Sequence, residues 1–218
     1  MNVVVALGGS VLSLSHPRHI EETAALIIKA SLEIDLYIVV GGGKTARAYV
    51  EAARTFCTDE RYLDSLGIAA TRLNAFLLNT FFRRAIPHTI EEAIDMSPPV
   101  IMGGTEPGHS TDTVAAMLAR ALKPARLLIA TDVDGVFDKD PKLSPDAKKL
   151  DAINIKQLRM WAGDSWEQAG KSTVIDAVAC KIIDEAQIPT YVLNGQHLDQ
   201  LENAIYGREF YGTIVELE

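Results

Sequence analysis

Two glycine clusters that directly follow apolar runs are the first residues in this sequence that could do chemistry. Gly8–Ser10 follows the run Val3–Leu7, and Gly41–Lys44 follows the run Leu36–Val40. Glycines at the end of a strand let backbone N–H groups approach a phosphate closely, and the helix that comes next adds the positive end of its dipole. Each cluster taken alone is equally consistent with a tight turn.

A third junction, after the apolar run Pro99–Met102, concentrates glycines, hydroxyl groups and an imidazole. Gly103–Asp112 reads GGTEPGHSTD and opens a helix at about Thr113. An ordinary N-cap at Ser110, Thr111 or Asp112 would account for the start of that helix, and in particular for Asp112. It would not account for the glycines together with the hydroxyl and imidazole groups. We therefore predict that this segment binds a ligand.

The fourth junction, Thr131–Pro141, comes after the run Leu127–Ala130 and is rich in aspartate. Its apolar Val136 and Phe137 could form a wall for an adenine ring, with Thr131 and Asp140 as polar contacts. The alternatives are an aspartate-rich turn and a calcium loop. An EF-hand calcium loop requires alternating oxygen ligands and a closing glutamate, which is absent here.

The sequence lacks the two best-known nucleotide motifs. No Gly-x-x-x-x-Gly-Lys-Ser/Thr occurs, and no Gly-x-Gly-x-x-Gly occurs either. The first absence argues against a P-loop kinase and the second against a simple dehydrogenase.

Short apolar runs that alternate with helical patterns must position these junctions. Besides the four runs already named, Thr190–Leu193 and Thr213–Val215 are predicted strands. The repeated switch of period predicts an α/β fold, a three-layer αβα sandwich with a mainly parallel central sheet. Ligands bind at the carboxyl ends of the strands in such sheets.

Two further segments have a clear character. Asp59–Ala85 is predicted to be helical for most of its length. Its apolar residues fall near one face, namely Leu63, Leu66, Ala70, Leu73, Leu77 and Phe81. The surplus of apolar residues leaves two interpretations open, an oligomer contact or packing within the subunit. Asp138–Lys149 is rich in Pro, Asp and Lys and is predicted to be an exposed loop.

The bulk composition limits the possible partners. The 218 residues suffice for one domain, residues 1–218, with room for two lobes. The net charge of −8 disfavours non-specific binding of nucleic acid or anionic lipid. No apolar stretch approaches the roughly 20 residues of a membrane span, and no signal-peptide pattern is present, so we expect a cytoplasmic protein. Cys57 and Cys180 are predicted to be buried apolar groups, with no Cys or His nearby at metal-binding spacing.

Taken in order, the motifs resemble uridylate kinases of the archaeal type, in the amino-acid-kinase superfamily. The matching segments are Gly8–Leu12, Val39–Arg47, Asp64–Ile68 with Thr71–Ala75, Gly103–Asp112 and Thr131–Pro141, followed by Gly170–Asp176 near the C-terminus. The resemblance covers nearly the whole chain. Five ordered motifs are far more specific than any single one of them.

This resemblance implies the amino-acid-kinase fold, with a UMP site and an ATP site that face each other across the strand ends. The implied UMP-binding residues are Gly42, Asp64, Thr105, Glu106, Pro107, Gly108, His109, Ser110 and Thr111. The implied ATP-binding residues are Gly9, Ser10, Gly43, Arg47, Thr131, Phe137 and Asp140, with Phe137 in place of an expected tyrosine. The N-terminal lobe, about 1–120, would bind UMP, and the C-terminal lobe, about 121–218, would bind ATP. The resemblance also implies a homohexamer built from dimers and a role in pyrimidine nucleotide biosynthesis.

Cations matter most in the implied reaction. A UMP phosphate is already anionic near pH 7, so catalysis reduces to alignment and to neutralisation of charge. Arg47 and Lys44 are the candidate catalytic cations, Mg²⁺ carried with ATP would supply the rest, and Asp112 could orient a lysine or the Mg²⁺ shell. The resemblance implies no metal-binding residue in the protein itself.

One departure from the superfamily is serious. Many members have a lysine two residues before the paired glycines, where this chain has Ala6. Lys44, Arg47 or Lys171 would have to supply the missing charge, unless the protein binds nucleotides with little turnover.

Other functions of the same fold stay open. Isopentenyl phosphate kinases tend to follow the glycine triplet with Ser and a Gly-His pair, but here Lys44–Arg47 follows. Kinases of acyl carboxylates, such as acetylglutamate or aspartate, fit the Thr105–Thr111 segment less well. A non-catalytic nucleotide-binding or anion-binding relative is the third alternative, and Ala6 is its best support.

Overall fold

The computed structural model describes residues 2–123, 126–163 and 174–217. A seven-stranded sheet has the order β3-β2-β1-β4-β6-β7-β5. The strands are β1 (Asn2–Leu7), β2 (Asp35–Val40), β3 (Val100–Met102), β4 (Arg126–Thr131), β5 (Ala152–Asn154), β6 (Thr190–Asn194) and β7 (Thr213–Glu216). All neighbouring strands pair in parallel except β6 and β7, which are antiparallel. The predicted α/β class and mainly parallel sheet are confirmed.

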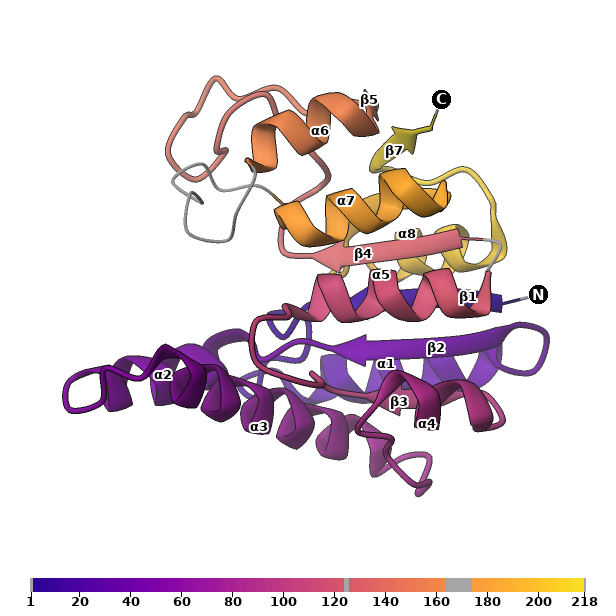
Figure 1. Cartoon of the computed structure of the whole chain (residues 1–218). Coiled ribbons are helices and arrows are strands. Elements are labelled where there is room, and N and C mark those ends of the chain that lie inside the picture. Colours follow the sequence, from indigo (N-terminus) through magenta and orange to yellow (C-terminus); the bar gives the residue numbers. More distant parts are fainter. Residues whose placement is uncertain (1, 124–125, 164–173, 218) are drawn as a thin grey trace.

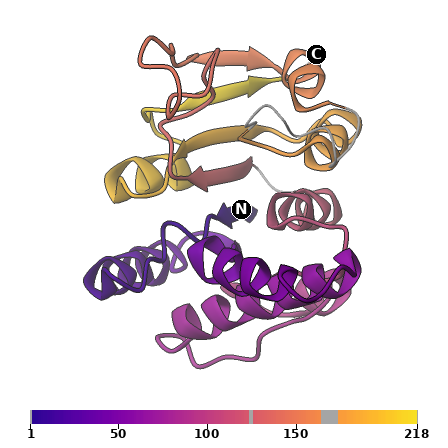
Figure 2. The same cartoon turned by 90° about the vertical axis from the view of Figure 1, so that its left-hand side faces the viewer.

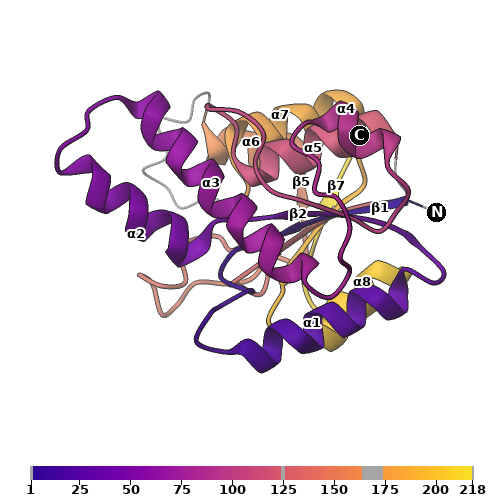
Figure 3. The same cartoon turned by 90° about the horizontal axis from the view of Figure 1, so that it is seen from below.

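Helices cover both faces of the sheet (Figures 1, 2 and 3). They are α1 (Pro17–Ala30), α2 (Gly43–Arg54), α3 (Glu60–Asn79), α4 (Ile90–Asp95), α5 (Thr111–Leu122), α6 (Ile155–Ala162), α7 (Ala177–Ala186) and α8 (Leu198–Tyr206). The core formed by the described residues consists of two hydrophobic clusters, one on each face of the sheet. Alternate residues of β1 belong to different clusters, because successive side chains of a strand point to opposite faces. Val4 and Ala6 pack on the side of α5 and α7, and Val3 and Val5 pack on the side of α1 and α8.

The predicted strands are confirmed to within a residue at their ends, but the sequence pattern does not reveal β5. This strand is three residues long, and of these only Ile153 is buried. So short a segment shows no periodicity that would separate it from a loop. The neighbouring Asp138–Lys149 segment is a loop, as predicted, although its base is tied by a β-bridge between Phe137 and Lys149.

The face of α3 that packs inward differs from the predicted one. Leu63 and Ala70 are buried, but Leu73 is 58% exposed, and Phe81, which lies beyond the end of α3 at Asn79, is 44% exposed. Thr71 and Asn74 are buried in their place, along with Ala75, Leu78 and Asn79. The prediction follows hydrophobicity alone. Polar loops pack against this helix and require polar partners, so the buried face is mixed.

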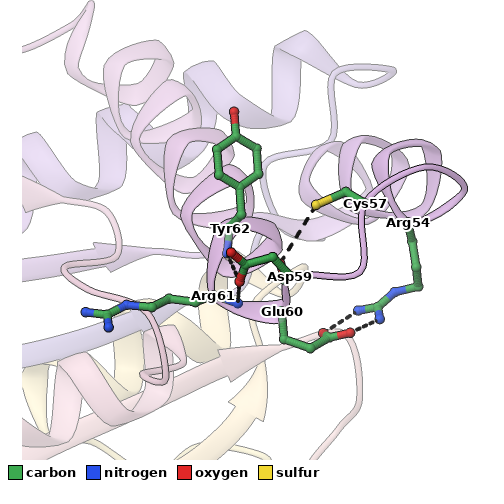
Figure 4. Close-up of polar contacts among 6 residues, drawn as sticks. All are labelled: Arg54, Cys57, Asp59, Glu60, Arg61 and Tyr62. Atoms are coloured by element: carbon green, nitrogen blue, oxygen red, sulfur yellow. Dashed lines mark hydrogen bonds and ion pairs between the residues drawn. The ribbon is translucent and has the colours of Figure 1, made fainter.

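The connection between α2 and α3 is closed by local polar contacts (Figure 4). Asp59 caps α3 by accepting hydrogen bonds from the backbone N–H groups of Arg61 and Tyr62, at 3.0 and 3.2 Å. Arg54 forms an ion pair with Glu60, and its hydrogen bond lowers the pKa of that carboxyl. Cys57 lies here and is only partly buried, which corrects the prediction for it; Cys180 is buried, as predicted.

None of the helices in the described part of the chain is long and apolar enough to cross a membrane.

Candidate active site

The carboxyl ends of β1, β2 and β4 meet at one edge of the sheet, where α2 and α5 begin (Figures 1 and 3). A cavity of about 360 Å³ opens there. Its lining contains residues from all four sequence junctions: Gly8, Gly9, Ser10, Gly41, Gly42, Gly43, Arg47, Thr111, Asp112, Ile129, Ala130, Thr131, Asp132, Lys142 and Val174. Segments far apart in the sequence therefore form one site, as expected for strand ends of a parallel sheet.

The first two glycine clusters lie directly against each other. A Cβ atom on Gly9 would stand 2.3 Å from the backbone nitrogen of Gly43 and 2.5 Å from the carbonyl oxygen of Gly41. Gly43 also has a φ of +56°, a conformation that favours glycine. The glycines are therefore required for close approach of two backbones, and the helix α2 that starts at Gly43 places free N–H groups at the cavity.

The third junction supplies the start of α5. The helix begins at Thr111 and not at Thr113, and its N-cap is Ser110, whose Oγ accepts a hydrogen bond from the N–H of Thr113 at 3.0 Å. Of the three N-cap candidates, Ser110 is confirmed, and Asp112 is not the N-cap. Asp112 lies in the first turn of the helix and lines the cavity. Its carboxyl group is therefore available to the site.

Asp176 ties α5 to α7 behind the cavity. Its carboxylate accepts hydrogen bonds from Ser110 and, at 3.0 Å, from Thr113 Oγ1. The same carboxylate caps α7 by accepting from the N–H groups of Val178 and Ala179, at 2.9 and 3.0 Å. A single carboxylate thus connects the starts of two helices. Sequence reasoning assigns no role to Asp176 beyond its place in the last motif.

The Asp112 carboxyl has an unusual protonation equilibrium. Burial and the nearby Asp176 raise its pKa from 3.8 to about 7. Because the folded state holds this proton more tightly than the unfolded state, its contribution to stability is present below about pH 4 and is lost as the pH rises through about 7.

Substitution of Asp112 by asparagine should therefore stabilise the protein in a pH-dependent way. The amide cannot ionise, so we expect the unfolding free energy of Asp112→Asn to exceed that of the wild type by a few kcal/mol at about pH 8, with little difference at about pH 4. Urea unfolding of the nucleotide-free protein at both pH values measures this. A difference that is the same at both pH values would show that Asp112 does not titrate between them.

The Thr105–Thr111 segment lies over α3. Asp64 Oδ2 accepts a hydrogen bond from the N–H of Gly108 at 2.9 Å, which joins two motifs that are 44 residues apart. Gly108 has a φ of +90°. His109 Nδ1 lies 3.4 Å from Glu106 Oε1. Thr105 and Pro107 line a second hollow of about 460 Å³, together with Arg72 and His88.

Eight of the predicted site residues line this cavity, whereas the larger number, including Asp64 and the segment 105–110, lies outside its lining. Gly9, Ser10, Gly42, Gly43, Arg47, Thr111, Asp112 and Thr131 line the cavity. Lys44 is exposed on α2 and does not line it. Phe137 and Asp140 are also outside the lining, and Asp140 instead accepts a hydrogen bond from the N–H of Lys142 at 2.8 Å. The prediction for Val136 is wrong, because its side chain is buried in the core and presents no wall to a ligand. Lys171 lies outside the described residues.

The cavity contains an ion pair that is not predicted from the sequence. Lys142 Nζ lies 2.8 Å from Asp132 Oδ2, and both residues line the cavity. Burial opposes ionisation of Asp132, but the hydrogen bond and charge of Lys142 outweigh it and lower the pKa of this carboxyl. Lys142 comes from the aperiodic loop, so only its position in the folded chain reveals it. Among the described residues, no group of three or more His, Cys, Asp and Glu side chains could hold a metal ion.

Comparison with known proteins shows the family of this chain. The model of the amino acid kinase family matches residues 1–194. Uridylate kinase from Thermococcus sibiricus is 42% identical over 225 residues, which cover 99% of this chain and 100% of the relative. Uridylate kinase from Methanopyrus kandleri is 42% identical over 226 residues, with 99% and 100% covered.

Solved structures give the same result. The crystal structure of uridylate kinase from Archaeoglobus fulgidus superposes with a TM-score of 0.87 at 39% identity, covering 99% of this chain and 100% of that one. A structure of isopentenyl phosphate kinase gives a TM-score of 0.70 at 20% identity, with 99% and 100% covered, which shows a shared fold. The chain belongs to the amino acid kinase family.

Proposed function

We propose that this protein is a uridylate kinase, which transfers the γ-phosphoryl group of ATP to UMP and yields ADP and UDP. The observation that carries the proposal is the single cavity at the strand ends, lined by residues of all four sequence junctions. Its support is similarity over the full length to proteins that bear the name uridylate kinase.

The residues at the cavity suit phosphoryl transfer. An oxygen of the UMP phosphate forms a bond to the γ-phosphorus while the bond from that phosphorus to the bridging oxygen of ADP breaks. The attacking oxygen is already anionic, so no general base is required and the protein contributes alignment and positive charge. Backbone N–H groups at the start of α2 and the guanidinium of Arg47 supply both.

The proposal includes Mg²⁺ bound with ATP. A divalent ion neutralises charge on the nucleotide phosphates when it is bound. The Asp112 carboxyl fits such a cation, because it lines the cavity and because burial and the nearby Asp176 carboxylate make its ionisation unfavourable without one. In the part of the chain that the structure describes, no group of three or more possible metal ligands is present. A single carboxylate is consistent with an ion that is bound mainly by the nucleotide phosphates.

The two substrates are assigned to the two halves of the sheet. We place UMP on residues 1–120, where Asp64 meets the Thr105–Thr111 segment, and ATP on residues 121–218, next to Thr131. Phe137 and Asp140 remain proposed contacts of the ATP nucleoside, beyond the phosphate cavity. Both follow Thr131 on the loop that borders it.

Many members of the superfamily have a lysine at the position of Ala6. Lys142 and Arg47 are candidates to supply the missing positive charge, because these two side chains are the cations in the described lining of the cavity. We expect Lys142→Ala to raise the KM for ATP several-fold, since one exposed phosphate contact is lost. Steady-state kinetics at saturating UMP measures the effect. Lys139→Ala is the matched control, because Lys139 pairs with Asp146 on the same loop and lies outside the lining. Equal effects of the two substitutions would remove Lys142 from the site.

We also propose that the protein assembles into a homohexamer, a trimer of dimers. Large apolar side chains are exposed on α3, where Tyr62 is 64% and Phe76 is 56% exposed. Burial of these side chains against a second copy would remove apolar surface from water. ATP and UMP are cytoplasmic nucleotides, so we assign the enzyme to the cytoplasm and to pyrimidine nucleotide biosynthesis.

The test is release of ADP from ATP and Mg²⁺ with a panel of acceptors, namely UMP, CMP, isopentenyl phosphate, acetylglutamate and aspartate. We expect turnover with UMP. Preferred turnover with isopentenyl phosphate or a carboxylate would replace the proposed acceptor. Silence across the panel, with ATP still bound in calorimetry, would favour a non-catalytic nucleotide-binding protein.

A further inference from the structure

Helix α3 contacts two loops of the site through three polar residues that do not themselves line the cavity. These are Thr71, Arg72 and Asn74, which we call the α3 clasp. One loop is the glycine triplet Gly41–Gly43. The other is Gly103–Thr105, which leads into the Thr105–Thr111 segment that we assign to UMP; residues 103–111 together are called the acceptor segment below. The polar character of these buried or half-buried positions is the feature that hydrophobicity does not predict for α3.

Asn74 holds the glycine triplet. Its side chain is 3% exposed, and its Nδ2 donates hydrogen bonds to the carbonyl oxygens of Gly41, at 2.9 Å, and Gly42, at 3.1 Å. A trans peptide carries its C=O and N–H on opposite sides. Carbonyl groups held towards Asn74 therefore turn the N–H groups of Gly42 and Gly43 away from α3. Asn74 thus fixes the orientation of the backbone of the glycine triplet, which lines the cavity.

Thr71 holds the acceptor segment and also contacts the triplet. Its hydroxyl accepts a hydrogen bond from the N–H of Gly104 at 2.7 Å and donates one to the carbonyl of Ile68 at 2.7 Å. A Cβ atom on Gly103 would lie 2.7 Å from this hydroxyl, and one on Gly42 would lie 3.4 Å from the Thr71 methyl group. Both loops therefore rest on one side chain.

Arg72 adds a second attachment of the acceptor segment. Its Nε donates to the carbonyl of Gly104 at 3.1 Å, and its Nη2 donates to the carbonyl of Thr105 at 3.0 Å. A guanidinium that bonds two successive carbonyl groups fixes the direction of the chain as well as its position. The segment that leads to the contact between Gly108 and Asp64 is thereby aligned at its start.

We propose that the α3 clasp is a positioning device, which sets the separation and orientation of the phosphate-facing glycine triplet and the acceptor segment. In-line transfer requires both substrates in register, and a displacement of about 1 Å can cost about a hundredfold in rate. The three residues act on the substrates through backbone groups of the two loops. The inference rests on the proposed function, since it assigns the acceptor to the Thr105–Thr111 segment.

Hydrogen exchange tests the clasp without any substrate. Thr71→Val keeps the shape of the side chain but leaves the Gly104 N–H without its partner, so exchange of a peptide spanning 103–110 should accelerate about tenfold in the nucleotide-free protein. Asn74→Asp removes both donors and should accelerate exchange of a peptide spanning 41–46. Thr80→Val is the matched control, because Thr80 makes the same hydroxyl-to-carbonyl bond at the end of α3, to Leu77 at 2.8 Å.

Kinetics separates positioning from general damage. We expect Thr71→Val to raise the KM for UMP about tenfold, with the KM for ATP nearly unchanged, because Thr71 bonds the acceptor segment. Thr71→Ser keeps the hydroxyl and should restore the KM for UMP. Asn74→Asp should instead lower kcat, because the triplet borders both substrates.

Two outcomes would overturn the clasp. One is unchanged exchange of both loops in Thr71→Val and Asn74→Asp variants that remain folded. The other is a uniform rise of both KM values that Thr71→Ser does not reverse, which indicates a structural role only. If the wild type fails to phosphorylate UMP but the exchange results hold, the proposed function is wrong and the loop-positioning role stands.

Discussion

Gly9→Ala should lower turnover about a hundredfold, because it separates two backbones that must touch at the phosphate site. The added Cβ would stand 2.3 Å from Gly43 nitrogen and 2.5 Å from Gly41 oxygen, and neither is the end of a flexible side chain. The loops must shift, and overpacking of this kind also costs about 1–3 kcal/mol of stability. Steady-state kinetics and urea unfolding measure the two effects.

Gly67→Ala is the matched control for this substitution. Gly67 lies within α3, and a Cβ there would meet only Val50 Cγ2 at 3.8 Å, an ordinary contact. Alanine is favoured over glycine inside a helix by about 1 kcal/mol, so this variant should be more stable than the wild type and fully active. If Gly9→Ala behaved like Gly67→Ala, the two glycine loops would not be in the contact described.

Arg47→Ala should lower kcat roughly tenfold or more, since it removes a cation from a site where charge develops in transfer. Arg47 lies one turn into α2 and lines the cavity, whereas Lys44 on the same helix does not. Rapid-quench or coupled assays at saturating ATP and UMP measure kcat directly. Because Arg47 is exposed, Arg47→Ala should change the free energy of unfolding very little. The loss of kcat would therefore not be explained by unfolding.

Lys44→Ala provides the comparison within the same turn of the helix. If Arg47 supplies the charge that Ala6 lacks, Lys44→Ala should leave kcat within about twofold of the wild type. A larger loss in Lys44→Ala than in Arg47→Ala would reverse the assignment and require α2 to present Lys44 when nucleotides bind.

The positions of the glycine junctions follow from the sequence because strand and turn signals there are local. Apolar runs that end in glycine predict a strand end, and parallel pairing brings such ends to one edge. Gly9 and Gly43 are an example, since their side-by-side position follows from adjacent strands β1 and β2. What the pattern does not reveal is that their main contact is with each other.

The features that sequence reasoning does not find depend on contacts between distant segments. Lys142 is a loop residue with no periodic neighbour, and its place at the cavity depends on the path of the chain after β4. Thr71 and Asn74 are part of a recognised motif, but a hydrophobicity pattern assigns polar residues to the outside of a helix. Their burial follows from the carbonyl and N–H groups of the loops above them, which require partners.

The shared fold does not choose the acceptor. The isopentenyl phosphate kinase structure superposes over 99% of this chain at 20% identity, so the two proteins share a fold although the names differ. Function resides in the site that a fold carries, so under the proposed function the Thr105–Thr111 segment and the helix that holds it are expected to select the acceptor. The panel of acceptors therefore tests which acceptor the loops select, and Gly9→Ala tests the contact between the two glycine loops.

The order of the strands also bears on how the chain folds as it is synthesised. Strand β5 is joined to the sheet through β7, which lies between β6 and β5 but is made long after both helices α6 and α7. The ribosome therefore releases β5 before its neighbour exists, and loop closure over this long separation is slow. Until β7 emerges, β6 presents an open edge, so this half of the nascent sheet is the part most exposed to mispairing with other chains.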